Sequence, residues 1–256
     1  LLWLGLTMFL VADERQFGLW LVLFGMGMAG LFFLSHTVIL ANQLTNVPGI
    51  DVEVWWRLGW LPIIIAPLLW YMLILWYVGY WDSKSGRLHL HRYALISLIM
   101  VAFALLFLHI FYQPIPTFEQ TAFLDFSNTT DWYGIPASLI IFPPFAILCV
   151  LLPLHALRHP TPSRRKMGDI ARQRARPWLM GTSILLLCVA LIVSLFILYV
   201  ILPDSAARGV RETTIFILPM VVLDLAVTGL IAGAIIALGQ AVVSYEIFTG
   251  KTLPRR

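Results

Sequence analysis

The chain alternates long apolar runs with short polar connectors. Six runs are long enough to cross a bilayer: residues 17–41, 55–81, 90–113, 134–157, 178–202 and 214–248. About 20 consecutive apolar residues span the hydrocarbon core as an α-helix. A shorter apolar run, residues 1–11, is interpreted as the tail of a helix whose start is missing. The pattern therefore predicts an all-α, polytopic membrane helix bundle of seven helices, six complete and the first truncated.

Composition supports a bilayer as the surroundings of this chain. Hydrophobic residues make up 60% of the 256 positions and charged residues only 12%, with a mean hydropathy of +0.88. A single soluble core of this size cannot hide so much apolar surface. Pro62, Pro67, Pro143 and Pro144 fall inside two of the runs. We expect kinks there, because neighbouring helices can satisfy the carbonyl groups that an interior proline frees.

Lysine and arginine gather on alternate connectors. Fourteen of the seventeen lie on connectors of one side, whereas the long connector 114–133 on the other side has none and carries three acids. Short connectors rich in Lys and Arg stay in the cytoplasm. The bias predicts an outside N-terminus and a cytoplasmic C-terminus, in a multi-pass protein of the bacterial cytoplasmic membrane. Residues 1–250 then form the transmembrane bundle, and residues 251–256 a cytoplasmic exit toward a further domain.

The densest basic stretch, residues 158–176, holds seven of the cations. Such a stretch is typical either of a nucleic-acid surface or of a cytoplasmic loop. The apolar remainder of the chain excludes nucleic acid as a partner, so we interpret the stretch as a loop that also suits anionic lipid headgroups. The loop cations are Arg164, Arg165, Lys166, Arg172, Arg174 and Arg176.

Cofactor chemistry depends on which polar side chains lie inside the runs. All three lysines lie in connectors, which excludes retinal bound as a Schiff base within this chain. His36 and His109 lie inside runs, near their predicted outer ends, and a facing pair of this kind ligates haem b. The alternative is that each bonds to backbone or to a tyrosine such as Tyr112. The other four, expected to meet water or headgroups, are His89, His91, His155 and His159.

Asp224 lies inside the last run. A carboxylate there costs ~2.5–3.5 kcal/mol on insertion scales and indicates a function by default. Four roles stay open: a proton site, an anchor for a cationic or polar ligand, a partner for His36 or His109, or a hydrogen bond that locks helix packing. Trp56 and Trp60 lie near the predicted outer interface, as members of an aromatic belt or as the lining of a ligand mouth.

Small residues recur every fourth position on the last run. They are Gly229, Gly233, Ala237 and Ala241. This spacing lets helices approach closely, either within the bundle or against a second copy or another membrane subunit.

The last run is 35 residues long, or ~52 Å as a helix, whereas the hydrocarbon core is about 30 Å thick. It ends on "AVVSYEIF", with Ala241, Tyr245 and Phe248 in a small-tyrosine-hydrophobic pattern. In this exit and in its topology the chain resembles the N-terminal seven-helix membrane region of bacterial sensor histidine kinases and related signalling proteins. The resemblance implies cytoplasmic GAF, PAS or kinase modules beyond residue 256, and any phosphorylated histidine would lie there.

Three hypotheses follow. The first is a sensory module that passes a ligand or membrane signal through its last helix. The second is a structural or electron-transfer subunit of a bioenergetic complex that binds haem, quinone or pigment. The third is a transporter that depends on Asp224. The residues contain no Walker loop and no HExxH or G-x-S-x-G motif, so we expect the chain itself not to be an enzyme.

Overall fold

The computed structural model describes residues 2–11, 17–45, 48–81, 89–112, 115, 117–122, 137–159, 169–201 and 213–245. Six of the helices in these ranges are long and apolar enough to cross a membrane, and the ranges contain no strand. The chain is a helical membrane bundle, as the apolar pattern predicts. Its helices are α1 (Leu2–Val11), α2 (Phe17–Thr45), α3 (Val52–Tyr77), α4 (His89–Phe111), α5 (Phe118–Ala122), α6 (Ala137–Arg158), α7 (Asp169–Ile201) and α9 (Thr213–Tyr245).

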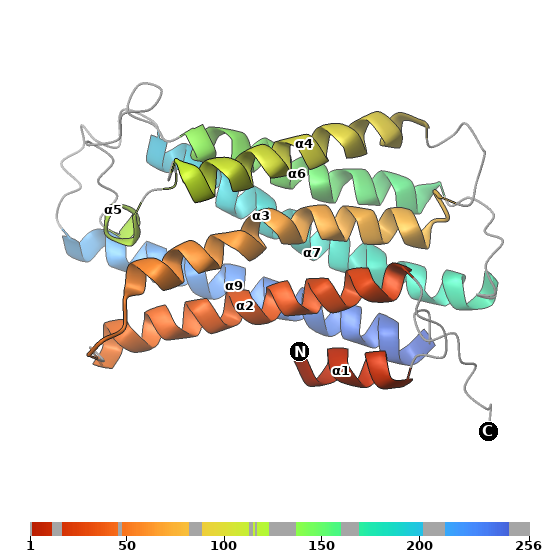
Figure 1. The fold of residues 1–256 in the computed structure, drawn as a ribbon, viewed down its shortest axis with the longest axis horizontal. Coiled ribbons are helices and arrows are strands. Elements are labelled where there is room, and N and C mark those ends of the chain that lie inside the picture. Colours follow the sequence, from red (N-terminus) through yellow and green to blue (C-terminus); the bar gives the residue numbers. More distant parts are fainter. Residues whose placement is uncertain are drawn as a thin grey trace.

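Successive long helices run in opposite directions (Figure 1). One end of the bundle, here called the basic end, is where α3 and α6 finish and where α4 and α7 begin. The other end, here called the α5 end, carries the short helix α5. The segments that flank the basic end are those richest in lysine and arginine. Alternate connectors therefore start from the same end of the bundle, as predicted, and the cytoplasmic placement of that end stays a prediction.

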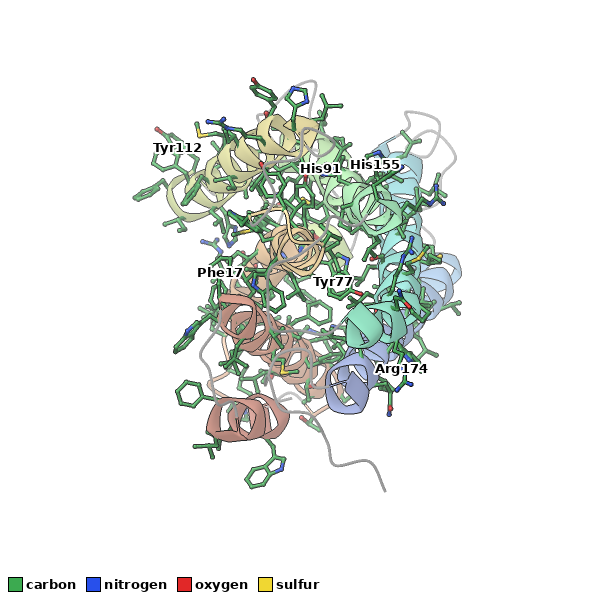
Figure 2. The ribbon with its side chains drawn as sticks, turned by 90° about the vertical axis from the view of Figure 1, so that its right-hand side faces the viewer. Phe17, Tyr77, His91, Tyr112, His155 and Arg174 are labelled. Carbon is green, nitrogen blue, oxygen red and sulfur yellow. The ribbon has the colours of Figure 1, made fainter. Side chains whose placement is uncertain are left out.

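Helix α3 lies at the centre. It packs against α2, α4 and α6, and between Trp70 and its last residue, Tyr77, every side chain except that of Met72 is buried. Pro62 and Pro67 lie within α3, which continues through both. The order of packing then runs from α6 to α7 and from α7 to α9, so that α9 lies at the edge of the bundle (Figure 2).

Two glycines allow α2 and α3 to approach closely. A Cβ atom on Gly18 would lie 2.5 Å from ring atoms of Trp76, and one on Gly59 would lie 3.0 Å from Ser35 Oγ. Trp76 is 3% exposed, so its ring is enclosed and has little room to move. The side chains of one helix therefore occupy the space that these glycines leave on the other.

One helix boundary corrects the sequence interpretation. Helix α7 begins at Asp169, nine residues before the predicted start, so Arg172, Arg174 and Arg176 lie on its first turns and not in a loop. Figure 2 shows Arg174 beside α7 and α9. Arginine has a good intrinsic helix propensity, and a charged turn can extend an apolar helix beyond the hydrocarbon. Arg164, Arg165 and Lys166 lie outside the described residues.

Helix α9 has 33 residues, close to the 35 predicted, and is ~50 Å long at 1.5 Å per residue. It exceeds the thickness of the hydrocarbon core by several turns. The predicted exit beyond Tyr245, including Phe248 and residues 251–256, lies outside the described residues.

A buried hydrogen bond joins α3 to α7. Trp70 Nε1 donates to Ser183 Oγ over 3.1 Å, and the Ser183 hydroxyl donates to the Leu179 carbonyl oxygen over 2.9 Å. We expect Ser183→Ala to lower the free energy of unfolding by about 0.5–1.5 kcal/mol, because the Trp70 N–H loses its acceptor. Circular dichroism during unfolding in detergent measures this loss. Ser194→Ala is the matched control, since the Ser194 hydroxyl bonds within α7 to Ala190, and an equal loss in both variants would contradict the prediction.

Candidate functional site

An ion pair at the edge of the bundle joins α2 to α9. His36 Nε2 lies 3.2 Å from Asp224 Oδ2, and the two side chains are 22% and 48% exposed. The ring of Phe32, one turn before His36, stacks on the imidazole with 5.9 Å between centroids and 9° between planes. The phenyl ring fixes the imidazole on the side of α2 that faces the carboxylate. Of the roles left open for Asp224, the structure supports that of a partner for His36.

This pair is the main described link between α2 and α9. Helix α9 otherwise packs on α7, and among its described side chains only Ala234 and Ala241 are buried. Asp224 itself is half exposed on the edge of the bundle. In a bilayer a carboxylate in this position stays only where a donor or cation compensates it, and His36 supplies that donor.

His109 has a different partner. Its Nε2 donates to the carbonyl oxygen of Arg57 on α3 over 3.0 Å, and its side chain is 8% exposed. The structure therefore gives His36 and His109 separate partners on α9 and α3, and it does not bring the two together as a haem pair. The alternative that His109 bonds to backbone is confirmed.

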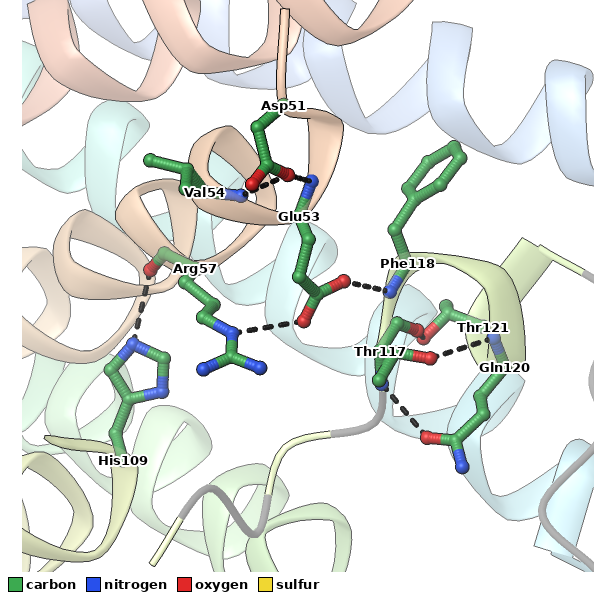
Figure 3. A network of polar contacts seen from close by, with 9 residues as sticks. All are labelled: Asp51, Glu53, Val54, Arg57, His109, Thr117, Phe118, Gln120 and Thr121. Carbon is green, nitrogen blue, oxygen red and sulfur yellow. Dashed lines mark hydrogen bonds and ion pairs between the residues drawn. The ribbon is translucent and has the colours of Figure 1, made fainter. Parts of the chain in front are cut away.

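A network of polar contacts surrounds the start of α3 at the α5 end (Figure 3). Asp51 caps α3, because its Oδ1 accepts from the backbone N–H groups of Glu53 over 2.9 Å and Val54 over 3.3 Å. The Glu53 carboxylate then binds in two directions. Its Oε1 accepts from Arg57 Nε over 2.9 Å, and its Oε2 accepts from the N–H of Phe118 over 2.9 Å. Glu53 thus connects α3 to the N-terminus of α5.

Helix α5 begins with a reciprocal cap. The Gln120 N–H donates to Thr117 Oγ1 over 3.1 Å, and the Thr117 N–H donates to Gln120 Oε1 over 2.9 Å. This is the Thr-x-x-Gln form of the capping box. The signal is visible in the sequence at residues 117–120, but it lies in a connector that the sequence interpretation treated as one long loop.

Glu53 is expected to hold α5 in place. With Glu53→Ala, the Phe118 N–H and the Arg57 guanidinium both lose a charged acceptor, and a helix of five residues is not stable alone. We expect the amides of residues 118–122 to exchange hydrogen at least tenfold faster, measured by mass spectrometry in nanodiscs. Glu119→Ala removes an exposed carboxylate from α5 itself and is the control. Unchanged exchange in the Glu53 variant would contradict this role.

The aromatic residues of this end differ in burial. Trp60 is 9% exposed and makes edge contacts with Trp56 and with Phe142 of α6, while Trp56 also meets Phe118 of α5. Both tryptophans thus belong to an aromatic cluster between α3, α5 and α6. Tyr112 is 70% exposed, and its ring contacts that of Phe107. The alternative that Tyr112 bonds to one of the two histidines was wrong, because His36 and His109 have other partners and Tyr112 follows α4 on its outward face.

The small-residue stripe of α9 is used only in part. Ala241 is buried, and a Cβ atom on Gly233 would lie 3.9 Å from Leu185 of α7. A Cβ atom on Gly229 would meet no atom within 4 Å, and Ala237 is partly buried. Close packing within the bundle therefore involves the second half of the stripe.

Two further findings concern residues that sequence reasoning placed differently or missed. His91 is 2% exposed, although we expected all four histidines of the basic end to meet water or headgroups. His89, His155 and His159 are exposed, as expected. Gly18 and Gly59, which make the closest approaches between α2 and α3, were not singled out, because nothing local distinguishes them from the other glycines.

No protein-family model, curated protein sequence or solved structure matches the chain at a significant level.

Proposed function

We propose that the chain is a sensory or signal-transducing membrane module whose output travels through α9. The observation that carries the proposal is the His36–Asp224 pair. It places the one described ionic link of α9 inside the membrane, half exposed, on a helix that otherwise rests on α7. A change in lipid, ligand or proton binding at this link would change how α9 sits on α2.

The length of α9 supports the same proposal. A helix of ~50 Å leaves about four turns outside a hydrocarbon core of about 30 Å. A rigid helix that continues past the membrane can pass a rotation or shift to a domain beyond it. We propose that such a domain follows in the cytoplasm and that any kinase activity resides there. The separate partners of His36 and His109 favour this function over an electron-transfer subunit.

A fusion of residues 1–256 to a kinase domain with a transcriptional reporter tests the proposal in bacterial cells. We expect His36→Leu and Asp224→Asn each to change reporter output severalfold. Inserting one, two or three residues after Val243, within the described part of α9, rotates the part of the helix that follows by ~100° per residue, and we expect output to vary with that period.

Gln240→Leu is the control, because Gln240 is an exposed polar residue of α9 outside the ion pair. Membrane levels of every variant are compared by immunoblot. The proposal fails if both pair variants reach normal membrane levels and give wild-type reporter output. It also fails if reporter output is the same for insertions of one, two and three residues.

A further inference from the structure

A chain of hydrogen bonds runs from the surface to the centre of the bundle at the basic end. The Tyr71 hydroxyl lies 2.7 Å from His91 Nδ1, and His91 Nε2 lies 3.1 Å from His155 Nδ1. The three residues come from α3, α4 and α6. Figure 2, which looks onto this end, shows His91 and His155 next to each other between α4 and α6. Their rings stack with 5.3 Å between centroids.

Burial decreases along these hydrogen bonds, from Tyr71 through His91 to His155. Tyr71 is 0% exposed and His91 is 2% exposed, whereas His155 is exposed. Both ring nitrogens of His91 are occupied, one by Tyr71 and one by His155. His155 is therefore the member that exchanges protons with the surroundings, and its Nδ1 is the atom that meets His91.

The hydroxyl of Tyr71 fixes the protonation of His91. A neutral imidazole has one N–H and one acceptor nitrogen. The Tyr71 hydroxyl also lies 3.5 Å from the His91 carbonyl oxygen, so the 2.7 Å contact with Nδ1 is the stronger hydrogen bond. Tyr71 thus donates to His91 Nδ1, and His91 carries its proton on Nε2. His91 is then a donor toward α6.

His155 must therefore accept the hydrogen bond that His91 Nε2 donates. Neutral His155 does so with the lone pair on Nδ1. A protonated imidazole has N–H on both nitrogens and no acceptor. Uptake of one proton by His155 therefore sets its N–H against the N–H of His91, and the hydrogen bond between α4 and α6 is lost.

We propose that His91 and His155 form a proton-binding latch between α4 and α6, closed when His155 is neutral and open when His155 has bound a proton. The added proton stays on His155, which turns toward the surroundings, and Tyr71 and His91 keep their own protons. No charge enters the core, because His91 remains neutral throughout. Histidine is suited to this role because its charge ordinarily changes between about pH 5 and 8.

Other titratable groups lie near the latch, on α4 itself and on the elements that pack against it. From α6, the ring of His159 lies 4.8 Å from that of His155, and its Nδ1 donates to the His155 carbonyl oxygen over 3.0 Å. Tyr80 and Cys149 lie near Tyr71. On α4 itself, the exposed rings of His89 and Tyr93 contact each other, and the flanking arginines are Arg92 of α4 and Arg158 of α6. Among the described residues, none of these groups is hydrogen-bonded to His91 Nε2 or to His155 Nδ1.

Spin-label distance measurements on the full chain in nanodiscs test the latch. Cys149 and Cys188 are replaced by alanine, and labels are placed at Ile96 of α4 and Leu151 of α6, which are both exposed. We expect one narrow distance at about pH 8 and a longer or broader distribution at about pH 5, across the range in which histidine titrates.

Three variants test whether loss of the acceptor on His155 is what separates α4 from α6. His155→Gln keeps an acceptor oxygen that does not titrate, so the narrow distance is expected at both pH values. His155→Arg presents only donors and is expected to give the open distribution at both. His159→Gln is the control and should keep the wild-type response. In ¹⁵N-histidine spectra of the unsubstituted chain, His91 should remain the neutral Nε2–H form while His155 becomes doubly protonated.

The proposal is overturned by a wild-type distance that ignores pH, by a pH response that survives in His155→Gln, or by double protonation of His91 in the same range. The spectra need no substitution, so they decide the matter even where a variant does not fold. The latch is independent of the proposed signalling role of α9.

Discussion

Replacing His36 with leucine is expected to lower the free energy of unfolding by about 2–3 kcal/mol. The substitution leaves the Asp224 carboxylate without its partner, on a side chain that is 48% exposed at the edge of an apolar bundle. A lone carboxylate at the centre of a spanning helix costs about 2.5–3.5 kcal/mol on insertion scales. The measurement is unfolding by a denaturing detergent, followed by circular dichroism.

A double-mutant cycle measures the interaction energy between His36 and Asp224 separately from the effect of each substitution. We expect Asp224→Leu to cost less than His36→Leu, because a neutral histidine is tolerated better than a lone carboxylate. We expect the double variant to recover most of the loss, since two apolar side chains suit a membrane-spanning edge and leave no uncompensated carboxylate. A coupling energy near zero between the two positions would contradict a direct interaction.

Gly18→Ala is expected to destabilise the bundle by about 1–3 kcal/mol, the usual range for overpacking a core. The added methyl group would lie 2.5 Å from the enclosed ring of Trp76, at the interface of α2 with α3. Thermal unfolding in detergent, with the melting temperature as readout, measures the change.

Gly25→Ala is the matched control on the same helix. A Cβ atom there meets nothing within 4 Å, and alanine is about 1 kcal/mol more favourable than glycine inside a helix. The two substitutions should therefore shift the melting temperature in opposite directions. Equal stabilisation by both would show that α2 and α3 do not approach at Gly18 as described.

The sequence predicted the number and type of the spanning helices because each apolar run is about as long as the bilayer is thick. It also singled out His36, His109 and Asp224 as titratable groups inside the runs, since such side chains are rare against an apolar background. The pairing of His36 with Asp224 was one of several alternatives, because composition does not say which faces of two distant helices meet.

The structure differs from the sequence prediction where backbone hydrogen bonds or contacts with other helices determine the place of a residue. Arg172, Arg174 and Arg176 continue α7 because helical hydrogen bonds do not require apolar side chains, whereas hydropathy detects only the apolar part. His91 is buried although it is near the end of α4, because Tyr71 and His155 on other helices enclose it. The role of Gly18 depends on Trp76, 58 positions further along the chain.

The attachment of α9 to α7 has a consequence for biosynthesis. The spans α7 and α9 lie side by side as a helical hairpin, and α9 makes its main contacts with α7. We expect this hairpin to leave the translocon after α2, α3, α4 and α6 and to dock onto these helices once they are inserted. Ser183 would meet Trp70, and Asp224 would meet His36, only at that final step. Until then the ribosome-bound chain carries an uncompensated carboxylate, which makes that stage the one most exposed to membrane quality control.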